Sequence, residues 1–237
     1  MCLIQDIHPG YLGNEDLIKE SALLYRLLSG TTFAKSENAN SRYLQLWGKH
    51  GWAAYRRYLW NLAEMKFRGL KQEYPEVAIQ QKDNKYSWPA LHGSPAQQLG
   101  SWGTTPVETS TARIPLPRNS QQLWAQHKYS ILARDVNLYR ELGPAVSAMR
   151  TGNDFSDLAN QLTLALRIQP DSGGIQNALQ HMWGYVSDDA EPKSKITGWS
   201  LRKLSQEIQE GAVLHGKKYL MHSTALTELE TWLPESQ

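Results

Sequence analysis

The residues best suited to chemistry stand at the beginning of the chain. Cys2 is the only cysteine among 237 residues and follows Met1, and a small second residue usually permits removal of the initiator methionine. Cys2 would then carry a free α-amine beside its thiol. An α-amine titrates near pH ~8, against ~10.4 for a lysine, so a useful fraction is unprotonated at neutrality. Such an amine can attack C1′ of a deoxyribose and form an imine, provided that a nearby carboxylate stabilises positive charge and shuttles protons.

The thiol of Cys2 offers a second chemistry. The beginning of the chain is similar to that of class II glutamine amidotransferases, which start Met-Cys-Gly and use the thiol as nucleophile with the α-amine as its base. Leu3 stands where that family has glycine, and the chain that follows reads as helical instead of strand-rich. An N-terminal-cysteine amidotransferase is therefore kept as an alternative.

The helix predicted over residues 14–30 supplies a carboxylate. Asn14 is a good N-cap, and a glycine closes the segment. Leu17 and Leu24 recur at helical spacing and define an apolar face. Glu20 lies roughly 60° from the centre of that face. A carboxylate beside an apolar face needs a partner or a function, although a surface glutamate at the rim of the face has the same pattern.

The remaining elements that position these groups are also helical, so the sequence predicts an all-α protein. Residues 31–41 form a polar loop, and a long helical segment follows over 42–68, in which Gly48 and Gly51 leave open whether it is one helix or two. No segment alternates convincingly as a strand. The further predicted helices cover 120–133, 135–150, 154–168, 173–186, 193–213 and 216–231.

Composition predicts two helical domains, 1–92 and 120–237, joined by a linker. Residues 93–119 are rich in Gly, Pro, Ser and Thr, which is typical of a linker. Residues 1–92 hold 12 Lys and Arg against 9 Asp and Glu, whereas the rest of the chain holds 13 against 14, within a formal net charge of +2. A nucleic-acid surface is therefore expected as a local patch in the first part.

Several classes of protein are excluded by simple features. One cysteine allows no internal disulfide, and we find neither a secretory signal nor 18 consecutive apolar residues, so the sequence predicts a soluble cytoplasmic protein without a membrane partner. His215 and His222 stand seven apart with no adjacent carboxylate, and no Gly-rich phosphate loop is present. We therefore predict no metal site and no cofactor.

Three stretches of the first seventy residues resemble the pyrimidine-dimer DNA glycosylases of the phage endonuclease V type. They are "HPGYL" at 8–12, "LIKESALLYRLLSG" at 17–30 and "LWGKHGWAAYRRYLWNLAEMKFRGL" at 46–70. In that family the amine of the residue after Met1 is the nucleophile, and a glutamate of the first helix is the acid/base. The resemblance implies a DNA repair glycosylase with β-lyase activity on damaged double-stranded DNA.

Carried over to this chain, the resemblance places the nucleophile at Cys2 and the acid/base at Glu20, with Lys19 replacing the family's arginine. An ungapped comparison instead puts Ala22 and Leu23 at that pair. If the ungapped comparison is right, the catalytic pair is lost and the protein is a non-catalytic nucleic-acid-binding protein on the same scaffold. The glycosylase and the non-catalytic binding protein therefore both stay open. For any one of the cations, a solvated helix face is also consistent with the pattern. The residues expected to meet the substrate or its phosphates are His8, Lys19, Arg26, Arg56, Arg57, Lys66 and Arg68.

The C-terminal part resembles the YbgA-type bacterial domain. The resemblance rests on "LWAQHKYSILARDVNLYRELGPAV" at 123–146, "GGIQNALQHMWGY" at 173–185 and "KKYL" at 217–220. It implies no settled activity. The candidate polar residues of this part are His127, Lys128, Asn177, His181 and Tyr185.

Overall fold

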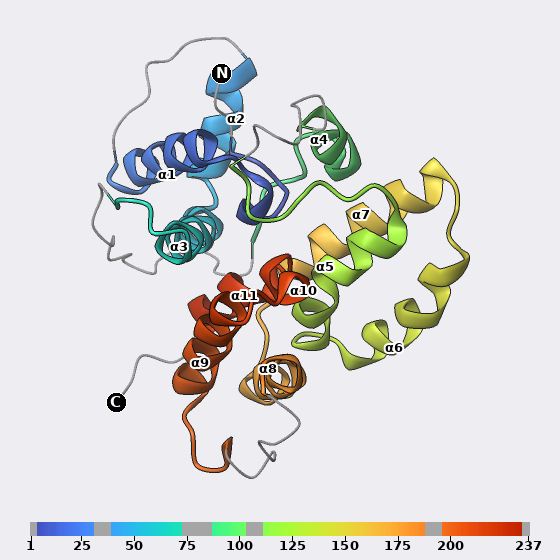
Figure 1. Ribbon diagram of the computed structural model, residues 1–237. Helices are drawn as coiled ribbons and strands as arrows, with labels where there is room; N and C mark the ends of the chain where they lie inside the picture. Colours follow the sequence, from blue (N-terminus) through green and yellow to red (C-terminus); the bar gives the residue numbers. More distant parts are fainter. Residues whose placement is uncertain (1–3, 31–38, 73–86, 103–110, 188–195, 234–237) are drawn as a thin grey trace. The chain divides into compact units, whose positions relative to one another are not determined.

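The computed structural model describes residues 4–30, 39–72, 87–102, 111–187 and 196–233, and all the regular elements in these ranges are helical. The protein is therefore all-α. The chain divides into two compact units, Met1–Ala112 and Arg113–Gln237, whose elements are labelled in Figure 1.

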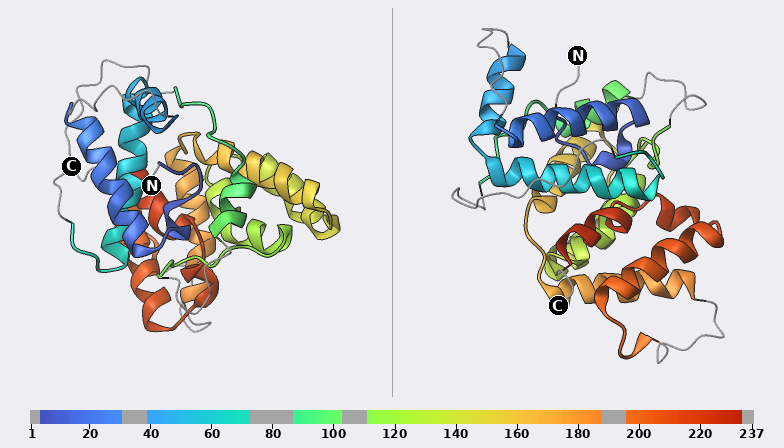
Figure 2. Two further views of the ribbon diagram at one scale, coloured as in Figure 1. Left: turned by 90° about the horizontal axis from the view of Figure 1, so that it is seen from above. Right: turned by 90° about the vertical axis from the view of Figure 1, so that its left-hand side faces the viewer.

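The first unit is built on the packing of two helices, α1 and α3, which run side by side (Figure 2). Leu17 and Leu24 of α1 are fully buried, as are Tyr58 and Met65 of α3, and burial of apolar surface is the main force that holds the pair together. The elements of this unit are η1 Pro9–Tyr11, α1 Asn14–Leu28, α2 Ala39–Gly48, α3 Gly51–Phe67 and α4 Pro95–Trp102.

The structure differs from the sequence prediction at the N-cap of α1 and decides that residues 42–68 form two helices. The N-cap of α1 is Gly13, and no side chain caps the helix. The side chain of Asn14 instead accepts a hydrogen bond from Arg68 Nη1 at 3.2 Å. The segment over 42–68 is two helices, α2 and α3, with the break falling between Gly48 and Gly51 as the low helix propensity of glycine allows.

The second unit is centred on α5, which packs against α6, α7 and α8, while α8 also packs against α9. Each of these five helices begins after a side chain that accepts a backbone N–H of the first turn, which is why the sequence starts helices at these points. The capping residues are Asn119, Asp135, Thr151, Asp171 and Ser200. The elements are α5 Ser120–Leu132, α6 Val136–Ala145, η3 Val146–Ala148, α7 Gly152–Leu166, α8 Ser172–Val186, α9 Leu201–Leu214, α10 Lys218–Met221, α11 Ala225–Glu228 and η5 Leu229–Trp232.

Two predicted helices of this unit are wrong in extent. The helix predicted over 193–213 begins only at Leu201, because Ser200 caps it there; residues 193–195 lie outside the described residues. The single helix predicted over 216–231 is three short helices. Thr224 breaks it, since its backbone N–H donates to the Gln126 carbonyl at 2.8 Å and its hydroxyl bonds that of Ser130 at 2.8 Å.

A helix also lies inside the segment whose composition predicts a linker. α4 covers eight residues of it, and the Gln98 side chain accepts a hydrogen bond from the backbone N–H of Asp6 at 2.9 Å. Among the described residues, we find no helix whose length and apolar character would let it cross a lipid bilayer.

Candidate functional site

Helices α1 and α3 bring a carboxylate, a guanidinium and an amide together in the first unit. Glu20 lies on the buried face of α1 and is 1% exposed. Arg57 and Asn61, one turn apart on α3, both donate to its Oε1, from Arg57 Nε at 2.6 Å and Asn61 Nδ2 at 3.1 Å. The backbone N–H of Gln5 donates to Glu20 Oε2 at 2.9 Å. We call Glu20, Arg57 and Asn61 the α1–α3 polar cluster.

This polar cluster is buried without being fully hydrogen-bonded. Arg57 Nη1 donates to the Ile7 carbonyl at 2.5 Å. Arg57 Nη2 and Asn61 Oδ1, in contrast, are buried and have no hydrogen-bond partner within the part of the chain that the structure describes. An unsatisfied buried polar atom costs about 1–3 kcal/mol, and such atoms are uncommon in folded proteins. Two such atoms lie in this one cluster, which makes it a candidate site.

Aromatic side chains pack around the same part of the unit. The Trp60 ring stacks on Trp88 with centroids 5.7 Å apart and on His8 at 6.4 Å. The Tyr43 hydroxyl donates to the Ile4 carbonyl at 2.8 Å, and burial, with a smaller contribution from Asp6, raises the pKa of Tyr43. Because Trp60 and Tyr43 are at most 4% exposed, these rings are core side chains.

Two of the residues predicted to meet the substrate hold the fold together. His8 is 2% exposed, and its Nδ1 accepts the backbone N–H of Gly10 at 2.9 Å, which caps η1. Arg68 Nε donates to Glu64 at 2.8 Å, and its Nη1 and Nη2 donate to the carbonyls of Leu12 and Pro9 at 2.8 and 3.3 Å. Arg68 therefore ties the "HPGYL" loop to α3, and we assign it a structural role.

The other predicted cations are more accessible. Lys19 is exposed and pairs with Glu15 at 3.0 Å, so Lys19 is not the partner of Glu20. Arg56 lies over the Trp52 ring at 5.6 Å, and burial lowers the pKa of Arg56. Arg26 of α1 and Lys66 of α3 are exposed. Cys2 lies outside the described residues.

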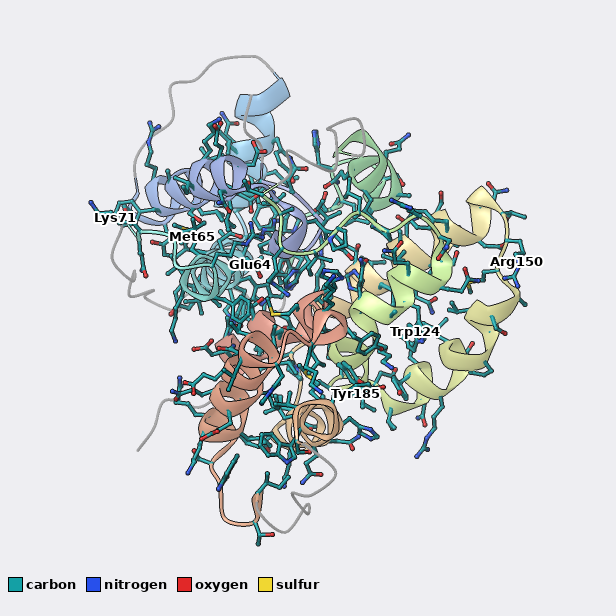
Figure 3. The ribbon with its side chains drawn as sticks, in the orientation of Figure 1. Glu64, Met65, Lys71, Trp124, Arg150 and Tyr185 are labelled. Atoms are coloured by element: carbon teal, nitrogen blue, oxygen red, sulfur yellow. The ribbon has the colours of Figure 1, made fainter. Side chains whose placement is uncertain are left out.

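The polar residues predicted in the second unit lie in three different surroundings. His127 is 4% exposed, and burial lowers its pKa to about 3. Lys128 and Tyr185, in contrast, belong to an aromatic cluster. In this cluster Tyr185 extends from α8 toward α5 (Figure 3). Asn177 and His181 line a pocket further along α8.

The aromatic cluster consists of one lysine and three tyrosines, Lys128, Tyr129, Tyr185 and Tyr219. Lys128 Nζ lies 4.8 Å from the centre of the Tyr129 ring and 4.9 Å from that of Tyr219. Tyr185 and Tyr219 stack with centroids 5.2 Å apart, and both are open to solvent, 47% and 36% exposed. Tyr129 is buried beneath them, and burial together with a hydrogen bond to Tyr185 raises the pKa of Tyr129.

The pocket of about 640 Å³ lies along the same helix. Amide and imidazole side chains of α8 form one wall, and the segment before α9, ending at Trp199, forms the other. The polar side chains contributed by α8 are Gln176, Asn177, Gln180 and His181.

Sequence reasoning missed the residues that complete both sites. Asn61 follows Arg57 by four positions, a spacing that places both on one face of α3 and could have suggested a joint role. Tyr219 stands in the "KKYL" motif that carries the YbgA-type resemblance, but its meeting with Tyr185 depends on how α8 and the segment after α9 pack. Among the described residues, no three His, Cys, Asp or Glu side chains are grouped closely enough to hold a metal ion.

Comparison with known proteins finds one family model that is similar to part of the second unit. Residues 128–227 match the model of the family described as Protein of unknown function (DUF1722). The predicted resemblance of the C-terminal part to the YbgA-type domain is thereby confirmed. Neither the curated proteins nor the solved structures give a match to this chain.

Proposed function

We propose that the protein is a DNA repair glycosylase with β-lyase activity, in which the α-amine of residue 2 is the nucleophile and Glu20 is the acid/base. The observation that carries the proposal is the α1–α3 polar cluster: a buried carboxylate held beside polar atoms that lack partners. The Glu20 carboxylate contacts the backbone of Gln5. Three residues of chain span at most about 11 Å, so an amine at residue 2 is tethered within reach of this region.

The chemistry requires one carboxylate to act twice. The amine forms a bond to C1′ of the damaged nucleotide, and the bond from C1′ to the base breaks with its electron pair leaving on the base. One proton of the amine then passes to the ring oxygen as the sugar ring opens to an iminium ion. Glu20 would stabilise that positive charge. It would then take a proton from C2′, so that the bond from C3′ to its oxygen breaks and the strand is cleaved with the phosphate as leaving group.

The structure changes one role that the family resemblance implies. Lys19 is an exposed partner of Glu15, whereas Arg57 donates to Glu20 and is 1% exposed. We therefore propose Arg57, not Lys19, as the cation that orients the acid/base. The unpartnered Arg57 Nη2 is a donor that a bound sugar or phosphate oxygen could use.

Covalent trapping tests the proposal. Intact mass of the purified protein first establishes that residue 2 carries the free amine. Borohydride should then trap the native protein on an abasic-site duplex, and Cys2→Ser should still trap because it keeps the amine. An uncleaved N-terminal extension should abolish trapping. Equal trapping by the extended protein would assign the nucleophile to a lysine and overturn the proposal, and loss of every activity in Cys2→Ser would favour the thiol and the amidotransferase.

A matched pair of variants on α1 tests the acid/base. Glu20→Gln should lower strand cleavage by about 10²–10⁴-fold, the usual contribution of a general acid or base. Glu15→Gln, which also removes one carboxylate from α1 but at a side chain 85% exposed, should cleave as the native protein does. Far-UV circular dichroism checks that Glu20→Gln is folded, and full cleavage by that variant contradicts the assignment.

A second candidate is a non-catalytic nucleic-acid-binding protein, and one observation favours it over an enzyme. Glu20 is 1% exposed, and the donors to its carboxylate are protein groups, as in a purely structural ion pair. This candidate predicts duplex binding that falls steeply with salt but no borohydride trapping under any condition.

A further inference from the structure

The second unit carries an exposed aromatic cluster beside a polar pocket. We propose that the aromatic cluster and the adjoining α8 pocket bind single-stranded nucleic acid, with bases stacked on Tyr185 and Tyr219 and phosphates held by Lys128 and Lys218. This inference does not depend on the glycosylase proposal, since it concerns a different unit and an undamaged ligand.

Exposed aromatic rings at the cluster are the first argument. Tyr185 is 47% exposed and Tyr219 is 36% exposed. Their rings stack with centroids 5.2 Å apart and an angle of 28° between the ring planes. The buried Tyr129 ring packs edge-on against both, at 6.3 Å in each case, and holds them in place from below. A fixed, solvent-accessible pair of rings is the platform on which proteins stack unpaired bases, independently of sequence.

Positive charge beside the rings is the second argument. Lys128 Nζ is held over Tyr129 and Tyr219, within 4.9 Å of each ring centre. Lys218 is exposed and precedes Tyr219 directly in the chain. Cations beside a stacking platform can contact the phosphates that join successive bases.

The pocket supplies the third argument. Asn177, His181 and Tyr185 follow one another at four-residue steps, so they lie along one side of α8. Asn177 and His181 line the pocket, together with the side-chain amides of α8 and Trp199. Side-chain amides pair with the hydrogen-bonding edges of bases, which are free only when a strand is unpaired. An acidic peptide would use the lysines but neither the stacked rings nor the amides.

Binding of a fluorescent oligo(dT) 12-mer to the full chain, followed by anisotropy at several salt concentrations, tests the inference. Tyr185→Ala should weaken binding roughly tenfold or more, whereas Tyr185→Phe should bind nearly as well as the native protein because it keeps the ring. Lys128→Gln should make the slope of log binding constant against log salt concentration shallower by about one, as expected for the loss of one phosphate contact. Arg140→Gln, which removes a positive charge from an exposed position of α6, should leave binding unchanged.

The outcomes separate the inference from its alternatives. Native binding by Tyr185→Ala, with thermal melting as the check on folding, overturns it, as does an equal effect of Arg140→Gln and Lys128→Gln. Polyglutamate that competes as well as unlabelled oligo(dT) shows a site for acidic peptides and also overturns it. A parallel oligo(U) arm distinguishes RNA from DNA. Because the ligand carries no abasic site and the readout is binding, failure of the glycosylase proposal would leave this result unaffected.

Discussion

Two buried arginine–glutamate pairs, Arg57 with Glu20 in the first unit and Arg134 with Glu228 in the second, are built differently. In the second unit Arg134 meets Glu228 with both Nη atoms, at 2.9 Å each, and neither side chain is exposed. Arg134 Nε donates to the Ile168 carbonyl at 2.7 Å, and Trp232 Nε1 donates to Glu228 at 3.1 Å. In this pair every nitrogen of the guanidinium has an acceptor.

The pair in the first unit is incomplete by the same measure. Arg57 meets Glu20 through Nε alone, and Arg57 Nη2 is buried without a partner. Burial of charge is costly unless every group is hydrogen-bonded, so a fold that needed only a structural tie would be expected to complete it as Arg134 and Glu228 do. The pair that we propose to be functional is therefore the one in which a buried donor has no partner among the described residues.

The largest effect is expected where the complete pair is broken. Arg134→Met leaves the Glu228 carboxylate buried without its cation and should lower the free energy of unfolding by about 3–5 kcal/mol. Urea denaturation measures it. The double variant Arg134→Met/Glu228→Leu should recover most of the loss, because an apolar pair of similar volume needs no counter-charge. Arg140→Gln should stay within ~0.5 kcal/mol of the native protein. A loss in the single variant no larger than that of this control would contradict the structural role.

Breaking the incomplete pair should cost less. Arg57→Met removes the bonds to Glu20 and to the Ile7 carbonyl but also removes the unpartnered Nη2, and Glu20 keeps the donors Asn61 and Gln5. We expect a loss of about 1–3 kcal/mol in the same urea assay, together with a fall in borohydride trapping. A loss of stability as large as that of Arg134→Met, with trapping unchanged, would make the two pairs equivalent and remove the basis of the comparison.

The buried His127 side chain differs from these charged pairs because it stays neutral in the folded protein. Burial lowers the pKa of His127 from 6.5 to about 3, so below pH 6.5 the unfolded chain binds a proton that the folded chain does not. Stability from this group is therefore complete above pH 6.5 and falls as the pH drops toward 3, by up to about 1.4 kcal/mol per pH unit. Between pH 7 and 5.5 the native protein should lose about 1 kcal/mol more than His127→Gln, measured by urea unfolding. Parallel losses in both proteins would show that His127 is protonated in the folded state.

The sequence was most informative where the physics is local. The helix predicted over 173–186 is α8 to within one residue, since the Asp171 cap and the apolar spacing act within the segment. The break in 216–231 could not be predicted, because it is made by hydrogen bonds from Thr224 to Gln126 and Ser130, more than ninety residues away. Periodicity carries no information about such partners.

The candidate site was predictable to the same limited extent. The position of Glu20 at the edge of an apolar face marked it as a carboxylate that needs a partner, and the structure shows it buried. The family resemblance put Lys19 in place of the arginine that precedes the acid/base, but a helix turns neighbouring residues about 100° apart, and Lys19 faces solvent. Arg57, thirty-seven residues away, becomes the partner only through the packing of α1 on α3.

The smallest effect is expected at the exposed pair that the sequence placed beside the acid/base. Lys19 and Glu15 are 56% and 85% exposed and stand one turn apart on α1, so solvent screens their attraction. Lys19→Gln should change the free energy of unfolding by no more than ~0.5 kcal/mol and should trap on an abasic-site duplex as fast as the native protein. Lys66→Gln, an equally simple loss of one exposed charge on α3, is the control for any weakening of duplex binding. If Lys19→Gln lost cleavage while Arg57→Met kept it, Lys19 would be the cation that serves Glu20, and the register in which it replaces the family's arginine would be correct after all.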